Sequence, residues 1–369
     1  MSFRQKEPPK VSDSRLPSCE SLTVAKVTER DEKMKIAYLI LVHDNPVLLK
    51  RMIEFLSSDD AAFFIHVDKK SDMGAFTEVK GKNIFFSPER IPVYWGEYSM
   101  VEATLILIQQ AVHAYPKNDY CVSLSGNTYP LKSREYIHDF FDKNRGHEFI
   151  NMINIYDGSG SRASSACSRY ISRKYCSYLK TLRVRSDRPI SRYGSKVLAR
   201  LGLARRDYRK YLETLEPYAG SMWWALTMNA CRYILDFVKT NQSFCRYYED
   251  TFVPDEMFFH TILGNSMFRP RIRRSLMYVD WSVPARHSHG DQFYGFLERS
   301  SNMSGHPAML NETHINFFEQ NERIMADDIY GPGEMLFARK FSDARLDLVR
   351  RIEKKIGLMD KDSSCHMNL

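Results

Sequence analysis

Short apolar runs and longer amphipathic stretches alternate along the chain from Met34 onward. Continuous apolar runs are typical of strands that are buried on both faces, whereas the stretches between them have the apolar spacing of helices. This alternation predicts an α/β fold with a mostly parallel central sheet. The predicted strands are Ile36–Val42, Ala61–Val67, Asn83–Ser87, Tyr120–Leu124, Glu148–Ile153 and, later in the chain, Trp223–Leu226.

Residues that favour helix N-termini mark where the first three predicted helices begin. Pro46–Leu56 opens with a proline, whose missing N–H would have no partner in a first turn. Ser99–His113 and Ser133–Phe141 each open with a serine that is predicted to be the N-cap. Because ligands collect beyond the carboxyl ends of parallel strands, the residues that follow three predicted strands, His43, Asp68 and Ser125, indicate a ligand site.

Composition and charge divide the chain into segments. Residues 1–33 are polar and are predicted to be a disordered leader, residues 34–345 a single domain, and residues 346–369 a helix and tail. The segment from about 160 to 215 is predicted to be a basic, helical insertion. Between Arg162 and Lys210 the sequence has 15 basic and 2 acidic residues, within a chain of net charge +8. A segment of this charge is typical of surfaces that bind phosphates, anionic lipid or an acidic glycan. The alternative is a solvated surface without such a ligand.

Several classes of protein are excluded or disfavoured. With 43% hydrophobic residues, the chain has ample material for a core and is not wholly disordered. It has no apolar run near the roughly 18 to 20 residues of a membrane span and no signal-peptide pattern, which predicts a cytoplasmic protein with reduced thiols. Its seven cysteines lack C-x-x-C spacing. Phosphate-loop, dinucleotide-binding, H-E-x-x-H and G-x-S-x-G motifs are absent, and His287, His289 and His306 do not have convincing metal-site spacing.

Two motifs carry candidate chemistry. Asp255 and Glu256 follow a proline and precede an apolar helix, where they act either as helix-cap carboxylates or, with Glu256, as a general base. Arg339 and Lys340 lie between apolar residues, either on a surface strand with solvated charges or facing a phosphate.

Six stretches of the sequence together carry a family resemblance: Ile65–Lys70, Tyr94–Gly96, Ser123–Leu131, Gly220–Thr227, Pro254–Thr261 and Phe337–Phe341. In these stretches, and in their order, the chain resembles the core-2/I-branching glycosyltransferases and the related protein xylosyltransferases, glycosyltransferase family 14. The resemblance covers about Met34 to Phe341, except the basic segment and parts of 285–330. It implies a GT-A type fold and inverting, metal-independent transfer from a UDP-sugar. The only D-x-D sequence, Asp360-Lys361-Asp362, lies in the polar tail, which agrees with a metal-free reaction.

The resemblance also implies roles for individual residues. Glu256 matches the catalytic base and Lys340 the lysine that binds the diphosphate. Asp68 matches the aspartate at the uridine end of the donor, and Val42 and His43 flank that end. The second diphosphate cation is matched to Arg286, with Arg339 as a substitute. The predicted sugar and acceptor cleft consists of Trp95, Ser125, Gly126, Asn127, Tyr129, Gly220, Ser221, Trp223, Trp224 and Asp255.

The leading hypothesis is a bacterial-type enzyme that transfers xylose or N-acetylglucosamine to a glycan or protein, with no metal or other cofactor and no nucleic-acid partner. The acceptor would be a precursor of a surface glycan. Residues 162–210 would then contact anionic lipid at the inner face of the membrane or bind an acidic acceptor. One alternative is a glycoside hydrolase that uses Glu256 with a second carboxylic acid. The other is a basic membrane- or nucleic-acid-binding module on an inactive glycosyltransferase fold.

Overall fold

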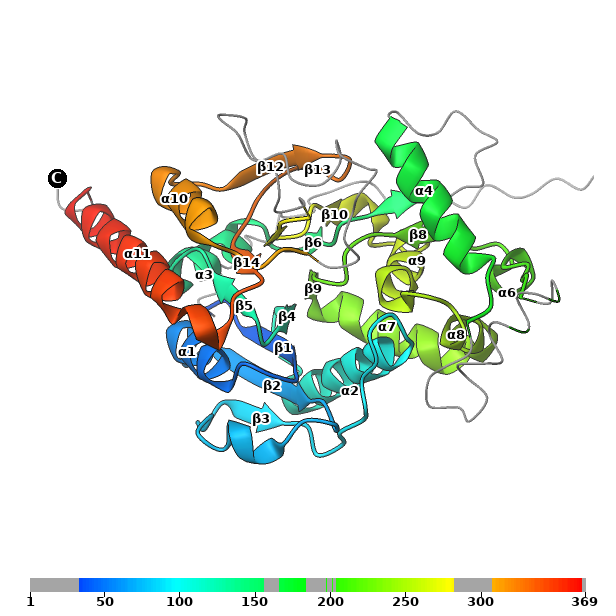
Figure 1. Ribbon diagram of the computed structural model, residues 1–369, viewed down its shortest axis with the longest axis horizontal. Helices are drawn as coiled ribbons and strands as arrows, with labels where there is room; N and C mark the ends of the chain where they lie inside the picture. Colours follow the sequence, from blue (N-terminus) through cyan, green and yellow to red (C-terminus); the bar gives the residue numbers. More distant parts are fainter. Residues whose placement is uncertain are drawn as a thin grey trace, which may run out of the picture. The chain divides into compact units, whose positions relative to one another are not determined.

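The computed structural model describes residues 33–155, 166–183, 204–281 and 307–366, together with Val197 and Leu201. Its centre is a seven-stranded sheet with the spatial order β10-β6-β9-β4-β1-β2-β3 (Figure 1). Only β9 runs antiparallel to its neighbours, so the prediction of a mostly parallel sheet in an α/β fold is confirmed. The strands are β1 (Ile36–Val42), β2 (Ala61–Val67), β3 (Ile84–Phe86), β4 (Tyr120–Ser125), β6 (Glu148–Phe149), β9 (Ala225–Thr227) and β10 (Ile272–Arg273).

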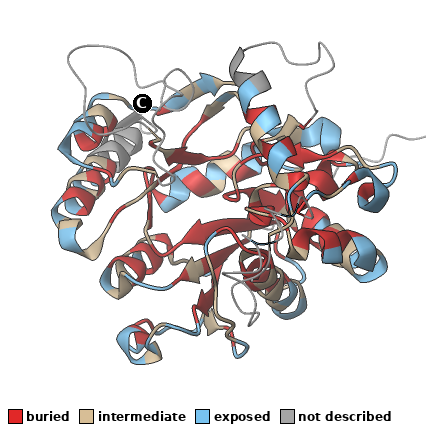
Figure 2. Cartoon of the chain, turned by 45° about the vertical axis from the view of Figure 1, so that its right-hand side comes forward, coloured by how far each residue is buried: buried red, intermediate tan, exposed pale blue. Residues whose placement is uncertain are grey.

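The central strands have apolar side chains on both faces because helices cover both sides of the sheet (Figure 2). Tyr38 and Phe63 face one side, where their rings stack 5.2 Å apart. Ala37 and Phe64 face the other. Helices α1 (Pro46–Leu56), α3 (Arg134–Lys143), α10 (Glu312–Gln320) and α11 (Leu346–His366) cover the first face. The second is covered by α2 (Ser99–Ala114), α4 (Ala166–Leu179), α6 (Arg209–Leu212), α7 (Met228–Thr240), α8 (Gln242–Glu249) and α9 (Phe258–Gly264).

Of the two serines that were predicted to be N-caps, one is an N-cap and the other is not. Ser133 is the N-cap of α3, and its hydroxyl accepts a hydrogen bond from the Tyr136 N–H at 3.2 Å, as predicted. Ser99 is instead the first residue of α2. Its hydroxyl accepts from the Tyr94 N–H at 2.9 Å, so it fixes the preceding loop and does not cap the helix.

The first helix receives its cap from the far end of the chain. Asn45 precedes α1 in a left-handed conformation, with φ 57°, and its side chain does not cap the helix. The Asp343 carboxylate accepts hydrogen bonds from the Leu48 N–H at 2.7 Å and the Val47 N–H at 3.2 Å. The beginning and end of the domain are therefore joined at the start of α1.

The predicted fifth strand, Glu148–Ile153, is two strands. β6 belongs to the central sheet, whereas β7 (Ile153–Asn154) pairs with β8 (Tyr218–Ala219). Between them the Asn151 side chain accepts from the Ser275 N–H at 2.9 Å, so the chain leaves the sheet at this residue. The predicted strand over Trp223–Leu226 likewise begins later, at Ala225, because Trp223 turns toward a cavity.

The Arg339–Lys340 motif lies at the end of the middle strand of a smaller sheet. Its strand order is β11 (Met277–Val279), β14 (Phe337–Arg339) and β5 (Thr128–Pro130), with β14 in the middle. Since Phe337 and Ala338 are buried, β14 is not a surface strand. A separate hairpin consists of β12 (Met325–Asp328) and β13 (Gly331–Glu334).

Four buried cysteines are free thiols: Cys121, Cys176, Cys231 and Cys245. Within the described ranges, no helix combines the length and the apolar content that crossing a bilayer requires.

Candidate functional site

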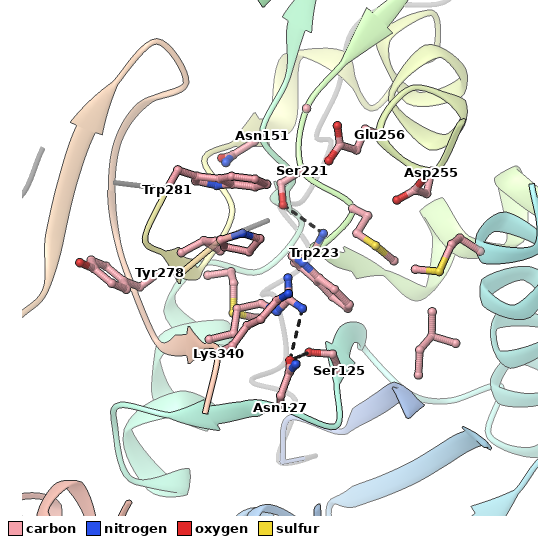
Figure 3. A pocket seen from close by; sticks show the side chains of 18 of the residues that line it. Ser125, Asn127, Asn151, Ser221, Trp223, Asp255, Glu256, Tyr278, Trp281 and Lys340 are labelled. Carbon is pink, nitrogen blue, oxygen red and sulfur yellow. Dashed lines mark hydrogen bonds between the residues drawn. The ribbon is translucent and has the colours of Figure 1, made fainter. Parts of the chain in front are cut away.

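A cavity of about 1120 Å³ lies at the carboxyl ends of the parallel strands. His43 follows β1, Asp68 follows β2, and Ser125 ends β4, and all three line this cavity. On the remaining sides it is lined by residues of α4, of the turn before α9, and of the smaller sheet and hairpin. In Figure 3, Glu256 and Asp255 lie on one side of Trp223 and Lys340 lies on the other.

Asp68 lies at the end of the cavity formed by β1 and β2. Its carboxylate accepts from the Lys70 ammonium at 2.7 Å, the Lys70 N–H at 2.9 Å and the Val93 N–H at 3.3 Å. Burial raises the pKa of Asp68, but the hydrogen bonds from Lys70 outweigh it and lower the pKa overall. Arg90 fixes the surrounding loop by donating to the carbonyls of Val67 at 2.9 Å and Asp68 at 2.8 Å. Asp68 is therefore an ionised acceptor in a rigid loop.

The loop after β4 joins the strand ends to the cationic motif. The Ser125 hydroxyl donates to the Asn127 side-chain oxygen at 2.6 Å, and the Arg339 guanidinium donates to the same oxygen at 3.2 Å. The guanidinium also lies over the Trp223 ring, 4.3 Å from its centroid. Gly126 packs so closely on β1 that an added Cβ would lie 2.3 Å from the Val42 side chain.

Arg339 and Lys340 form the cationic wall of the cavity. Burial lowers the pKa of Arg339 to about 9. Burial also lowers the pKa of Lys340, as does repulsion from Arg339, whereas Asp44 opposes the shift. Within the described part of the chain, neither cation forms a salt bridge. Because two neighbouring charges without a carboxylate partner are costly to bury, this wall favours an anionic ligand.

The acidic wall is a short 3₁₀ helix, η2 (Pro254–Glu256). Val253, the residue before it, has φ 45°, a strained conformation for a β-branched residue. Hydrogen bonds hold the turn on both sides: the Val253 N–H donates to the Gly96 carbonyl at 3.0 Å, and the Gly220 N–H donates to the Glu256 carbonyl at 2.9 Å. Neither acidic side chain caps a helix. The turn instead fixes both carboxyl groups at the cavity.

The two carboxyl groups have different surroundings. Asp255 is only 6% exposed, and its Oδ1 has no hydrogen-bond partner. Burial raises the pKa of Asp255 to about 8, with a further contribution from Glu256. Glu256 is half-buried, and its Oε2 accepts a 2.6 Å hydrogen bond from the Tyr175 hydroxyl. Burial raises the pKa of Glu256, whereas Tyr175 and then Lys174 oppose that shift.

The structure brings most of the predicted site residues together. The residues that line the cavity are Val42, His43, Asp68, Trp95, Ser125, Gly126, Asn127, Gly220, Ser221, Trp223, Asp255, Glu256, Arg339 and Lys340. Arg286 lies outside the described residues.

Tyr129 and Trp224 were predicted in the cleft but do not line the cavity. Tyr129 is fully buried, and its hydroxyl donates to Glu353 at 2.5 Å. Trp224 packs against Phe259 on the opposite side, with ring centroids 5.9 Å apart. In extended chain, neighbouring side chains point in opposite directions, so Trp223 and Trp224 cannot both face one cavity.

Sequence reasoning missed a group of cavity residues. The described part of the basic segment contributes α4, which lines the cavity beside Glu256 and is not merely a solvated insertion. The available signal was Tyr175 and Tyr178, which are three residues apart and therefore lie on one helical face. The other missed residues include Asn45, Lys70, Asn151, Lys174, Arg274, Tyr278, Trp281 and Tyr330.

Gly220 is expected to be indispensable for packing at the acidic wall. An added Cβ would lie 1.7 Å from the Asn151 carbonyl oxygen, a backbone atom that cannot simply rotate away. We expect Gly220→Ala to lower the free energy of unfolding by about 1–3 kcal/mol, measured by urea denaturation. Gly357→Ala is the matched control, because that exposed position in α11 has open space and alanine should stabilise the helix by about 1 kcal/mol. An unchanged midpoint for Gly220→Ala would contradict this packing.

No group of three or more His, Cys, Asp or Glu side chains that could hold a metal ion occurs among the described residues. Asp360 and Asp362 belong to α11. Among the chemical groups that line the described cavity are the Asp255–Glu256 carboxyl pair, the Arg339–Lys340 cations and several aromatic rings.

Comparison with known proteins identifies similar sequences. The family model described as Core-2/I-branching enzyme matches residues 36–304. A xylosyltransferase of Ciona intestinalis is 25% identical over 241 residues, which are 63% of this chain and 25% of that protein. Xylosyltransferase 2 of Homo sapiens is 27% identical over 244 residues, again 63% of this chain and 25% of the relative. The chain thus matches a quarter of the length of these relatives.

Among solved structures, a chain described as a glucose-1-phosphate thymidylyltransferase of Bacillus anthracis aligns with a TM-score of 0.27 and 10% identity. The alignment covers 56% of this chain and 78% of that one.

Proposed function

The chain belongs to the Core-2/I-branching enzyme family, and from this membership and the geometry of the cavity we propose that it transfers a sugar from a UDP-sugar to a hydroxyl group of a glycan or protein. The observation that carries the proposal is that one cavity has Glu256 on one side of Trp223 and Lys340 on the other (Figure 3), with Arg339, next to Lys340 in the chain, also lining it. A transferase needs both, because the acceptor loses a proton while the leaving diphosphate gains charge.

The proposed reaction is a single displacement with inversion at the anomeric carbon. The acceptor oxygen forms a bond to that carbon as the bond to the β-phosphate oxygen breaks, and the electron pair of the broken bond leaves with UDP. Glu256 takes the proton of the acceptor hydroxyl. Lys340 and Arg339 offset the charge that develops on the diphosphate, so the reaction needs no metal ion.

The donor would lie across the strand ends. The Asp68 carboxylate is ionised and held by Lys70, so it is a suitable acceptor for the N–H or O–H groups of uridine. Val42 and His43, at the end of the neighbouring strand β1, line the same cavity. Trp95 and Trp223 offer rings against which the sugar can pack. The xylosyltransferase relatives support xylose as the transferred sugar, with N-acetylglucosamine as the second candidate.

A hydrolase is less well supported by the carboxyl pair. Glycosidases place their two carboxyl groups on either side of the bond that breaks, roughly 5–10 Å apart. Asp255 and Glu256 are neighbours on one turn and lie on the same wall. This arrangement suits one base with a supporting group.

The cytoplasmic location and the contact of residues 162–210 with anionic lipid remain predictions.

The direct test is a thermal-unfolding panel of UDP-xylose, UDP-N-acetylglucosamine, UDP and a non-uridine nucleotide sugar, each with and without EDTA. We expect UDP and one of the UDP-sugars to raise the midpoint equally in both buffers, because cations of the protein bind the diphosphate. Enzyme-dependent release of UDP from that donor should also persist in EDTA. Loss of release with EDTA and recovery with manganese would contradict the metal-free reaction, and no stabilisation by any UDP compound would contradict the proposed function.

A further inference from the structure

Two adjacent carboxyl groups on η2 face one cavity, yet only one of them can serve as the base. Two negative charges on consecutive residues of one turn in a largely buried site repel each other, so the pair retains a proton in the neutral range. The sequence alone does not say which member keeps it, because aspartate and glutamate have similar intrinsic acidities. Their hydrogen-bond partners therefore decide the distribution of charge.

Helix α4 reaches only one of the two carboxyl groups. The Tyr175 hydroxyl donates to Glu256 Oε2 at 2.6 Å, a short hydrogen bond typical of a charged acceptor. Tyr175 is 7% exposed, and burial keeps the pKa of its hydroxyl well above the usual range, so it remains a donor. Asp255 Oδ1, in contrast, is buried without any partner. A charge on Glu256 is stabilised by a side-chain donor, whereas Asp255 has only the hydrogen bond of its own backbone N–H.

We propose that Tyr175 is a positioning residue that holds Glu256 as the ionised member of the pair and leaves the proton on Asp255, an inference that rests on the proposed glycosyl transfer. The Tyr175 hydrogen bond also fixes the direction of the carboxylate, leaving Oε1 to take the acceptor proton. Asp255, as a neutral acid, is free to donate a hydrogen bond to a substrate hydroxyl. The helix from the basic segment is thereby part of the proton-transfer apparatus.

The other titratable groups near Glu256 agree with this assignment. Lys174, next to Tyr175 on α4, favours the charged form of Glu256. Tyr178, one turn further along α4, is also affected by the charge of Glu256, and burial raises its pKa, so it is neutral. His260 on α9 is fully buried, which lowers its pKa to about 3, and its Nε2 lies 3.0 Å from the Ser221 carbonyl oxygen. His260 is therefore neutral and does not compensate either carboxylate.

The test is the pH dependence of kcat/KM for release of UDP from UDP-xylose or UDP-N-acetylglucosamine, with water as the acceptor. Because the free enzyme must have Glu256 ionised, the acid limb of this profile reports its protonation. Tyr175→Phe removes only the hydroxyl and should move the acid limb to higher pH. At a pH on that limb, we expect kcat/KM of Tyr175→Phe to be about tenfold lower than that of the wild type. The difference should become smaller at higher pH, where Glu256 ionises without the hydrogen bond from the tyrosine hydroxyl. Tyr170→Phe is the control, since that ring lies on the same helix and is exposed.

The outcomes are distinguishable. If the wild-type chain released no UDP from either donor, the proposed function would fail. If the wild type were active and the Tyr175→Phe profile had the wild-type acid limb, or a loss of the same size at every pH, the positioning role would be overturned. Unfolding temperatures identify a variant that does not fold, in which case Tyr175→Met removes the same hydroxyl with a more adaptable side chain and is measured in the same way.

Discussion

Replacing Glu256 with glutamine is expected to reduce the rate of UDP release and of sugar transfer by a factor of roughly 10²–10⁴, the usual contribution of a general base. The amide has nearly the same shape as the carboxylate but cannot take the acceptor proton. Glutamine can still accept a hydrogen bond from Tyr175, so the wall of the cavity should keep its geometry. UDP lies on the opposite side in the proposed mode, and its affinity should stay within about twofold, because no contact with the nucleotide is removed.

The measurement combines initial rates with calorimetric titration of UDP. Glu54→Gln is the matched control, since the same change is made at an exposed position of α1 that does not line the cavity. Wild-type turnover of Glu256→Gln would remove this residue from the role of base. Lost turnover together with lost UDP affinity would show that Glu256 supports the nucleotide site and would leave the base unidentified.

Replacing Lys340 with alanine should have the second-largest effect. A protein cation at the developing charge typically contributes about 10²–10³ to kcat, and here it would also bind the diphosphate before reaction. We therefore expect lower kcat and, from the loss of one charge-assisted contact, UDP affinity reduced by about tenfold or more. Arg339 lies next to it and should retain part of the effect.

Uridine provides the internal control for this variant. Since uridine has no phosphate, its affinity should be the same for Lys340→Ala and the wild type, whereas that of UDP should fall. Lys239→Ala changes a lysine whose side chain is 74% exposed and should alter neither affinity. Equal losses for uridine and UDP would indicate a collapsed cavity, and unchanged UDP affinity would place the diphosphate elsewhere.

The fold could be predicted from the sequence where the pattern of apolar residues was long and regular. β1, β2 and α1 have the predicted positions, because an apolar run of strand length, interrupted in β2 only by His66, or a proline-led amphipathic stretch admits few alternatives. The strand predicted over Glu148–Ile153 was wrong in extent. Its interruption depends on Asn151 bonding to Ser275, a partner more than a hundred residues away that no local pattern reveals.

The candidate site was likewise predictable where local motifs define it and not where it depends on distant partners. The motifs located the Asp255–Glu256 and Arg339–Lys340 pairs, since charged residues beside apolar runs are conspicuous in the sequence. The contact between Tyr175 and Glu256 could not be predicted, because it joins residues 81 positions apart. Trp224 was assigned to the cavity with its neighbour Trp223, and only the backbone direction separates the two.

The cap that Asp343 supplies to α1 has a consequence for biosynthesis. The two partners of that cap are separated by 295 positions, and the contact between Arg51 and Glu353 spans 302. A ribosome makes the first β-α unit long before it makes these partners, so the nascent unit waits with an uncapped helix and an uncovered apolar face. The cap of α1 and its contact with Glu353 are therefore completed only after residues 343–353 have been synthesised, which makes them a late step in the folding of this unit.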